Sequence, residues 1–108
     1  MEQNIDIEWS DADRSCLENL GFTVSGSMAL KDDSACRFIL RARELQIQSE
    51  MKTLAGVPLC ASSGPTVLEA LINLKTAWGQ LQDDFNEMED DIYGLCWDAE
   101  REYTRDEP

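Results

Sequence analysis

The clearest pattern of apolar residues lies in the C-terminal third of the sequence, where they recur at alternating spacings of three and four residues. The positions are Leu71, Leu74, Trp78, Leu81, Phe85, Met88, Ile92, Leu95 and Ala99. This spacing matches positions a and d of a coiled-coil heptad. It predicts one long helix over residues 65–105, with Gly79 and Gly94 as the two places where the helix could break.

A second helix is expected over residues 34–55, because this segment is rich in good helix formers and is followed by Gly56 and Pro58. Its apolar residues form two faces. One face has Phe38, Ala42 and Leu45, and the broader one has Leu40, Ile47, Met51 and Leu54. Residues 56–64 are then the linker between this helix and the long one.

The N-terminal part predicts an arm and a short helix. Ile5, Ile7 and Trp9 alternate with polar residues, as in a short strand or an extended arm. Ser10 is a suitable N-cap for a helix that ends at Gly21. Its apolar face consists of Cys16, Leu17 and Leu20. Residues 22–30 fit either a hairpin or a loop, so minor β structure is expected only within residues 3–30.

These elements predict a single, mainly α-helical domain over residues 1–108, a helical hairpin or small helical bundle. It comprises an arm and short helix (1–33), a second helix (34–55), a linker (56–64) and the long heptad-patterned helix (65–105). The second helix is too short to cover the long one over its whole length. We call the row of apolar residues at positions a and d of the long helix the apolar seam. The part of this seam beyond the second helix must be covered by the N-terminal part, by another protein or by a second copy of the chain. The chain is therefore expected to be a monomer or an antiparallel homodimer.

Charge narrows the choice of partners. The 108 residues include 22 acidic and 9 basic ones, for a formal net charge of -13, and residues 82–108 alone hold 11 acidic and 2 basic residues. This excess of negative charge creates an electrostatic field that repels phosphate groups, which argues against direct binding to nucleic acid or to an anionic membrane. A basic protein surface is the expected partner.

The residues for most catalytic chemistry are missing from the sequence. It has no histidine, no phosphate-binding loop and no CxxC pair among its four cysteines. We therefore expect no enzymatic activity, no cofactor and no metal. The N-terminus lacks the features of an export signal, and no apolar run reaches the length of a membrane span, so a cytoplasmic protein with reduced cysteines is expected. Two disulfides would require an oxidising compartment.

The first functional hypothesis is an inhibitor that covers the basic surface of a nucleic-acid-binding enzyme, as a nucleic-acid mimic. The size and charge of this chain resemble those of phage anti-defence proteins, such as inhibitors of restriction or CRISPR complexes, and of nuclease immunity proteins. For a phage-encoded chain, the compartment would be the host cytoplasm. The expected partner-binding residues are Asp83, Asp84, Glu87, Asp90, Asp91, Tyr93, Trp97 and Asp98.

Within this set, Tyr93 and Trp97 lie one helical turn apart and point away from the apolar seam. They are expected either to form an exposed aromatic patch or to pack under the N-terminal arm. The second functional hypothesis is a helical coiled-coil adaptor or secretion-type chaperone that holds a partner helix on the uncovered part of the seam.

Overall fold

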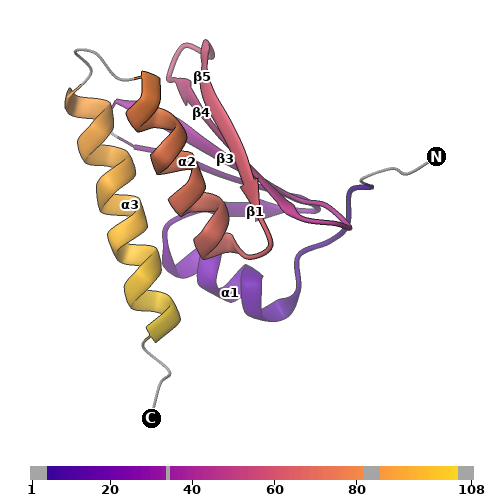
Figure 1. The fold of residues 1–108 in the computed structure, drawn as a ribbon. Coiled ribbons are helices and arrows are strands. Elements are labelled where there is room, and N and C mark those ends of the chain that lie inside the picture. Colours follow the sequence, from indigo (N-terminus) through magenta and orange to yellow (C-terminus); the bar gives the residue numbers. More distant parts are fainter. Residues whose placement is uncertain (1–4, 34, 82–85, 105–108) are drawn as a thin grey trace.

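The computed structural model describes residues 5–33, 35–81 and 86–104 of the chain. Within these residues it forms a five-stranded antiparallel sheet and three helices (Figure 1). The elements are α1 (Asp11–Asn19), β1 (Thr23–Ser25), β2 (Met28–Asp32), β3 (Cys36–Ala42), β4 (Ile47–Thr53), β5 (Pro58–Gly64), α2 (Val67–Leu81) and α3 (Asn86–Thr104). The expected mainly α-helical bundle was therefore wrong, and the protein has a mixed α/β fold.

The sheet is a simple meander in which each strand pairs with the next along the chain. Alternate residues of the central strands face the helices. In β3 these are Phe38 and Leu40, which lie opposite Met51 and Ser49 of β4. Side chains at these positions form the core together with residues of all three helices. The core thus lies between one face of the sheet and a layer of helices (Figure 1).

The helix predicted over residues 34–55 is instead the hairpin of β3 and β4. Its residues favour a helix by only a few tenths of a kcal/mol each. The alternation of Cys36, Phe38, Leu40 and Ala42 places all four side chains on the buried face of the sheet. Leu45, which was assigned to a helical face, is exposed in the hairpin turn. Tertiary burial of one strand face outweighed local propensity here.

The predicted linker 56–64 contains β5, which forms one edge of the sheet. The register shifts between Met51 and Lys52, and Pro58 begins the strand. A register shift and a proline both weaken pairing of an edge strand with another chain. After β5, the Thr66 hydroxyl accepts a hydrogen bond from the Glu69 backbone N–H at 3.1 Å, which caps the start of α2.

The long helix predicted over 65–105 consists of two helices that pack side by side (Figure 1). Gly79 and Gly94 both lie inside these helices, so neither is where the helical pattern is interrupted. The described part of the apolar seam is buried within the chain itself. Its members are Leu71, Leu74 and Trp78 on α2 and Ile92, Leu95 and Ala99 on α3. A spacing of three and four is equally suited to a coiled coil and to two helices that both pack on a sheet.

The N-terminal expectations agree better with the structure. Ser10 caps α1 by accepting a hydrogen bond from the Asp13 N–H at 3.1 Å, and Gly21 follows the helix with a φ of 98°. Residues 22–30 form the hairpin rather than a loop. Its turn contains Gly26, with a φ of 61°. This left-handed conformation is one that glycine adopts without strain.

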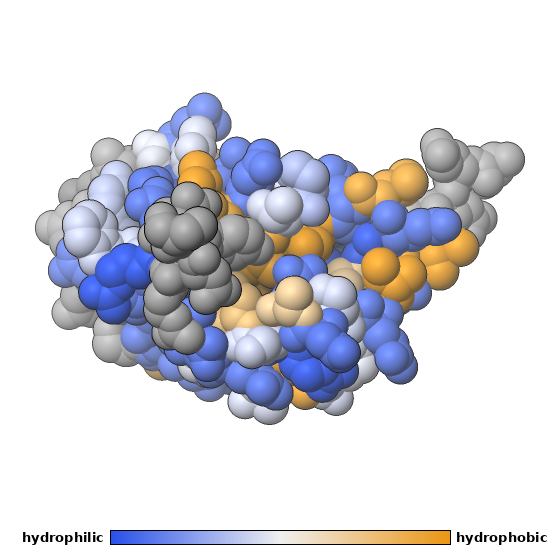
Figure 2. Space-filling model, turned by 90° about the horizontal axis from the view of Figure 1, so that it is seen from below, coloured by the Kyte–Doolittle hydropathy of each residue, from blue (hydrophilic) through white to orange (hydrophobic). Residues whose placement is uncertain are grey.

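Figure 2 shows the molecule from below the view of Figure 1. This surface is largely hydrophilic, with hydrophobic groups near its middle and at the end that carries the N-terminal arm. None of the described helices is long and apolar enough to cross a membrane.

Candidate functional site

The side of α3 that faces away from the core carries two large aromatic side chains. Trp97 is 64% exposed and Tyr93 is 50% exposed, whereas Ile92 and Cys96 beside them are buried. This orientation follows from helical spacing, because residues 93 and 97 lie one turn apart on the side opposite the seam. The described part of the N-terminal arm does not cover them, so the aromatic pair is accessible.

The two aromatic side chains differ in their surroundings. The Lys75 ammonium on α2 lies 5.1 Å from the centre of the Tyr93 ring, within the range of a cation–π interaction. This contact spans the two helices and positions the Tyr93 ring. Trp97 is the more exposed of the two and is therefore the main apolar contact that this surface offers.

Carboxylates flank the aromatic pair on the same helix. Asp90 is exposed one turn before Tyr93, and Asp98 is half-exposed and lies 3.6 Å from the Arg101 guanidinium. Further along, Glu102 accepts a hydrogen bond from the Asn19 side chain at 3.2 Å, which connects α3 to α1. We call Asp90, Tyr93, Trp97 and Asp98 together the outer face of α3.

Asp91 was expected in the binding site, but its side chain is buried. One of its oxygens accepts a hydrogen bond from the Ala35 backbone N–H at 2.8 Å and a weaker one from the Cys36 thiol at 3.7 Å. These bonds hold α3 against the start of β3. Asp91 thus positions the helix within the fold and presents no free carboxylate to a partner.

Three further expected site residues receive no test from the structure. Asp83 and Asp84 lie outside the described residues, and Glu87 lies in α3 with its side chain outside the description. Of the expected carboxylates whose side chains are described, Asp90 and Asp98 lie on the outer face of α3 and Asp91 is buried.

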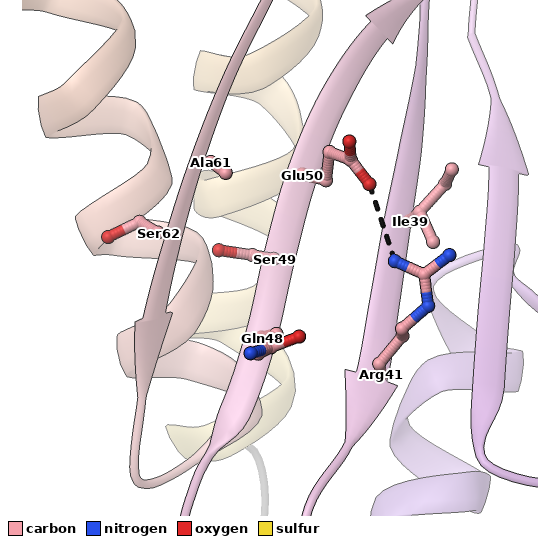
Figure 3. A pocket seen from close by; sticks show the side chains of 7 residues that line it. All are labelled: Ile39, Arg41, Gln48, Ser49, Glu50, Ala61 and Ser62. Carbon is pink, nitrogen blue, oxygen red and sulfur yellow. Dashed lines mark hydrogen bonds and ion pairs between the residues drawn. The ribbon is translucent and has the colours of Figure 1, made fainter. Parts of the chain in front are cut away.

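Sequence reasoning missed the face of the sheet that points away from the helices. It contains a hollow of about 280 Å³, where Arg41 of β3 lies 3.4 Å from Glu50 of β4 (Figure 3). The other residues around it are Ile39, Gln48, Ser49, Ala61 and Ser62. A second pair on this face joins Arg37 to Asp32 at 2.6 Å, and it lowers the pKa of the Asp32 carboxyl. With its main charges paired, this face resembles the solvated side of an antiparallel sheet.

The remaining candidates for chemistry are metal-ligating and nucleophilic side chains. The described residues contain no group of three or more His, Cys, Asp or Glu side chains that could hold a metal ion. The four cysteines are free thiols. Burial raises the pKa of Cys16, Cys60 and Cys96 to about 11. Burial and then the nearby Asp91 charge raise the pKa of Cys36 to about 12. At neutral pH these thiols are protonated and therefore weak nucleophiles.

No protein-family model matches the chain, and no curated protein or solved structure shows significant similarity to it.

Proposed function

We propose that this protein binds other proteins and docks the outer face of α3 on a basic surface of its partner. The partner class we favour is a nucleic-acid-binding protein, which the bound chain would inhibit by covering the surface that contacts phosphates. The observation that carries the proposal is the accessible Trp97, 64% exposed next to carboxylates on a regular helix.

Aromatic exposure supports the binding role. Exposing a large aromatic side chain to water is unfavourable, whereas burying it at an interface contributes strongly to affinity. Tryptophan and tyrosine are among the residues most enriched at interface hot spots. On α3, Trp97 and Tyr93 occupy adjacent turns, so both can enter a single contact.

Charge supports the choice of a basic partner. Asp90 and Asp98 lie on either side of the aromatic pair along the helix and can accept charge-assisted hydrogen bonds from arginine or lysine. The formal net charge of -13 creates a field that attracts a cationic surface over longer distances. The basic surfaces that hold nucleic acids match both features.

The adaptor or chaperone hypothesis placed a partner helix on the uncovered part of the apolar seam. Ile92, Leu95 and Ala99, the described seam residues of α3, are buried in the core of this chain. They therefore offer no free apolar seam to a partner helix. Because these three residues are already buried within the chain, a second copy is not needed to cover this part of the seam.

The test is affinity capture from lysate of the source cell or its host, washed at increasing salt and with duplex DNA as competitor. Four tagged proteins are compared: the wild type, Trp97→Ala, Asp90→Lys and the control Glu18→Lys. Glu18 is exposed on α1, so its change alters charge equally without altering the outer face of α3.

We expect the wild type and Glu18→Lys to capture a nucleic-acid-binding protein that salt and DNA release, because attraction between charges weakens with ionic strength. Trp97→Ala and Asp90→Lys should each lose most of this capture. Equal capture by all four proteins would contradict the proposal.

A further inference from the structure

A second hollow, of about 290 Å³, is lined in part by the N-terminal arm. The arm lies on the opposite side of the molecule from α3 (Figure 1). The hollow is formed where the N-terminal arm meets the turn between β3 and β4 and the residue Pro65 before α2. Two exposed aliphatic side chains line it: Ile7, 45% exposed, and Leu45, 59% exposed. Hydrophobic groups are visible at this end of the molecule in Figure 2.

Backbone hydrogen bonds hold the two walls of this hollow in place. The Ile7 N–H donates to the Ala42 carbonyl at 3.0 Å, and the Glu44 N–H donates to the Ile5 carbonyl at 2.7 Å. The arm thus extends the sheet beside the end of β3. Because both walls belong to hydrogen-bonded backbone, the hollow is formed before any partner arrives, which lowers the entropic cost of binding.

The hollow carries an excess of negative charge. Glu8, Asp13 and Glu44 line it, and the guanidinium of the one basic residue in its lining, Arg43, lies 2.7 Å from the Asp6 carboxylate. Asp6 balances the Arg43 charge, so these residues together carry a formal charge of -3. An apolar centre with an acidic rim complements a basic, amphipathic ligand.

One residue that lines the hollow, Trp9, has a buried hydrogen-bond donor without an acceptor among the described residues. Trp9 lines it and is only 5% exposed, and its indole Nε1 has no hydrogen-bond partner in the described part of the chain. Buried donors without an acceptor are uncommon in folded proteins.

We propose that this hollow, the arm site, binds a basic amphipathic segment of a partner protein. An aliphatic side chain of the segment packs between Ile7 and Leu45, and flanking lysine or arginine side chains pair with Glu8, Asp13 and Glu44. A second copy of this chain is a poor occupant, because two acidic surfaces repel each other. The arm site is separate from the outer face of α3 and does not depend on the function proposed for that face.

The probe for this site is a fluorescein-labelled peptide of alternating lysine and leucine, titrated with the full chain and followed by fluorescence anisotropy. Leu45→Ser is compared with Leu54→Ser, since Leu54 is also an exposed leucine but lies in the turn between β4 and β5. Glu44→Lys is compared with Glu18→Lys, which changes the net charge by the same amount away from the hollow.

We expect Leu45→Ser and Glu44→Lys each to weaken peptide binding by about fivefold or more, the loss typical of a contributing interface residue. Leu54→Ser and Glu18→Lys should leave the affinity within about twofold of the wild type. A matched peptide with serine in place of leucine should bind more weakly than the original.

Absence of peptide binding to the wild type would overturn the proposal. Equal affinities for Leu45→Ser and Leu54→Ser would also overturn it. Trp97→Ala separates the two surfaces: it should leave peptide affinity unchanged. Loss of binding in Trp97→Ala together with normal binding in Leu45→Ser would place the peptide on α3, which would overturn the arm site and leave the proposed function standing.

Discussion

Gly64 at the end of β5 lies so close to α2 that a side chain has no room. A Cβ atom there would come within 2.7 Å of the Ala70 nitrogen and 2.8 Å of the Glu69 carbonyl carbon, both of them backbone atoms. We predict that Gly64→Ala lowers the free energy of unfolding by about 2 kcal/mol, because backbone cannot move aside as a flexible side chain can. Urea denaturation measures this change.

Gly79 provides the matched control. It lies inside α2, and a Cβ atom added there would have no atom within 4 Å. Gly79→Ala should therefore raise the free energy of unfolding by roughly 0.5–1 kcal/mol, the difference in helix propensity between alanine and glycine. A similar effect of both substitutions would mean that α2 does not pack on β5 as described.

The raised pKa values of the cysteine thiols predict how the free energy of unfolding changes at alkaline pH. Burial raises the pKa of Cys60 from the ordinary value of 9.0 to about 11, and the other three thiols shift in the same direction. Between pH 9 and pH 11 the unfolded chain releases thiol protons that the folded chain retains. The free energy of unfolding should therefore be unaffected by the thiols below pH 9 and fall as pH rises through this window.

Urea denaturation at neutral pH and at about pH 10 tests this dependence. Tyrosine and lysine also titrate there, so Cys60→Ala serves as the control: its stability should fall less steeply than that of the wild type. An equally steep fall in both proteins would show that this thiol does not contribute.

At the residue scale, local sequence signals predicted α1 well and the candidate site only in part. The Ser10 cap and the end at Gly21 depend on neighbouring residues alone, so both could be predicted. Helical spacing placed Trp97 away from the apolar seam, but whether the N-terminal arm covers it could not be predicted from the sequence, and the structure shows it exposed. The burial of Asp91 could not be predicted, because its hydrogen-bond donor at Ala35 is distant in sequence and meets it only in the folded sheet.

At the scale of elements, the attachment of α3 to the sheet depends on Asp91. Removing its carboxylate in Asp91→Ala leaves the Ala35 N–H and the Cys36 thiol without this acceptor. We expect the free energy of unfolding to fall by about 1–3 kcal/mol, the usual cost of an unsatisfied buried group. Chemical denaturation followed by circular dichroism measures it.

The neighbouring Asp90 is the control for this prediction. It is exposed on the same helix, so Asp90→Ala should change the free energy of unfolding by no more than about 0.5 kcal/mol. Comparable destabilisation by both substitutions would contradict the assignment of Asp91 to the fold and of Asp90 to the surface.

The errors at this scale have one physical origin. Residues 34–55 have the composition of a helix, yet they form two strands because long-range pairing buries alternate side chains. The seam of residues 71–99 was correctly expected to be buried where the structure describes it, but its spacing does not specify what covers it. Contacts distant in sequence decide both questions, and local patterns contain little information about them.

At the scale of the whole molecule, charge is distributed unevenly. Residues 23–64, which contain the sheet, have a formal charge of +1, whereas residues 1–22 have -5 and residues 65–108 have -9. The two acidic regions contain the arm that borders the second hollow and the helix with the aromatic outer face. The sheet between them supports both surfaces, and its own charged groups largely balance.

Both acidic regions combine negative charge with exposed apolar side chains, which favours recognition of basic partners with apolar contacts over attraction by charge alone. Among the residues of these two regions whose side chains the structure describes, the exposed aromatic ones are Tyr93 and Trp97 on the outer face of α3. The central claim is therefore that Trp97 lies at the contact with the partner.

The most direct measurement is site-specific photocrosslinking in cells, with a photoreactive phenylalanine derivative in place of Trp97 and, in a separate protein, in place of Leu54. Both positions are exposed, but only position 97 lies on the outer face of α3. We predict a covalent adduct with a basic, nucleic-acid-binding protein from position 97, lost when Asp90→Lys is added, and no such adduct from position 54. The absence of that adduct from position 97, or equal adducts from both positions, would contradict the account.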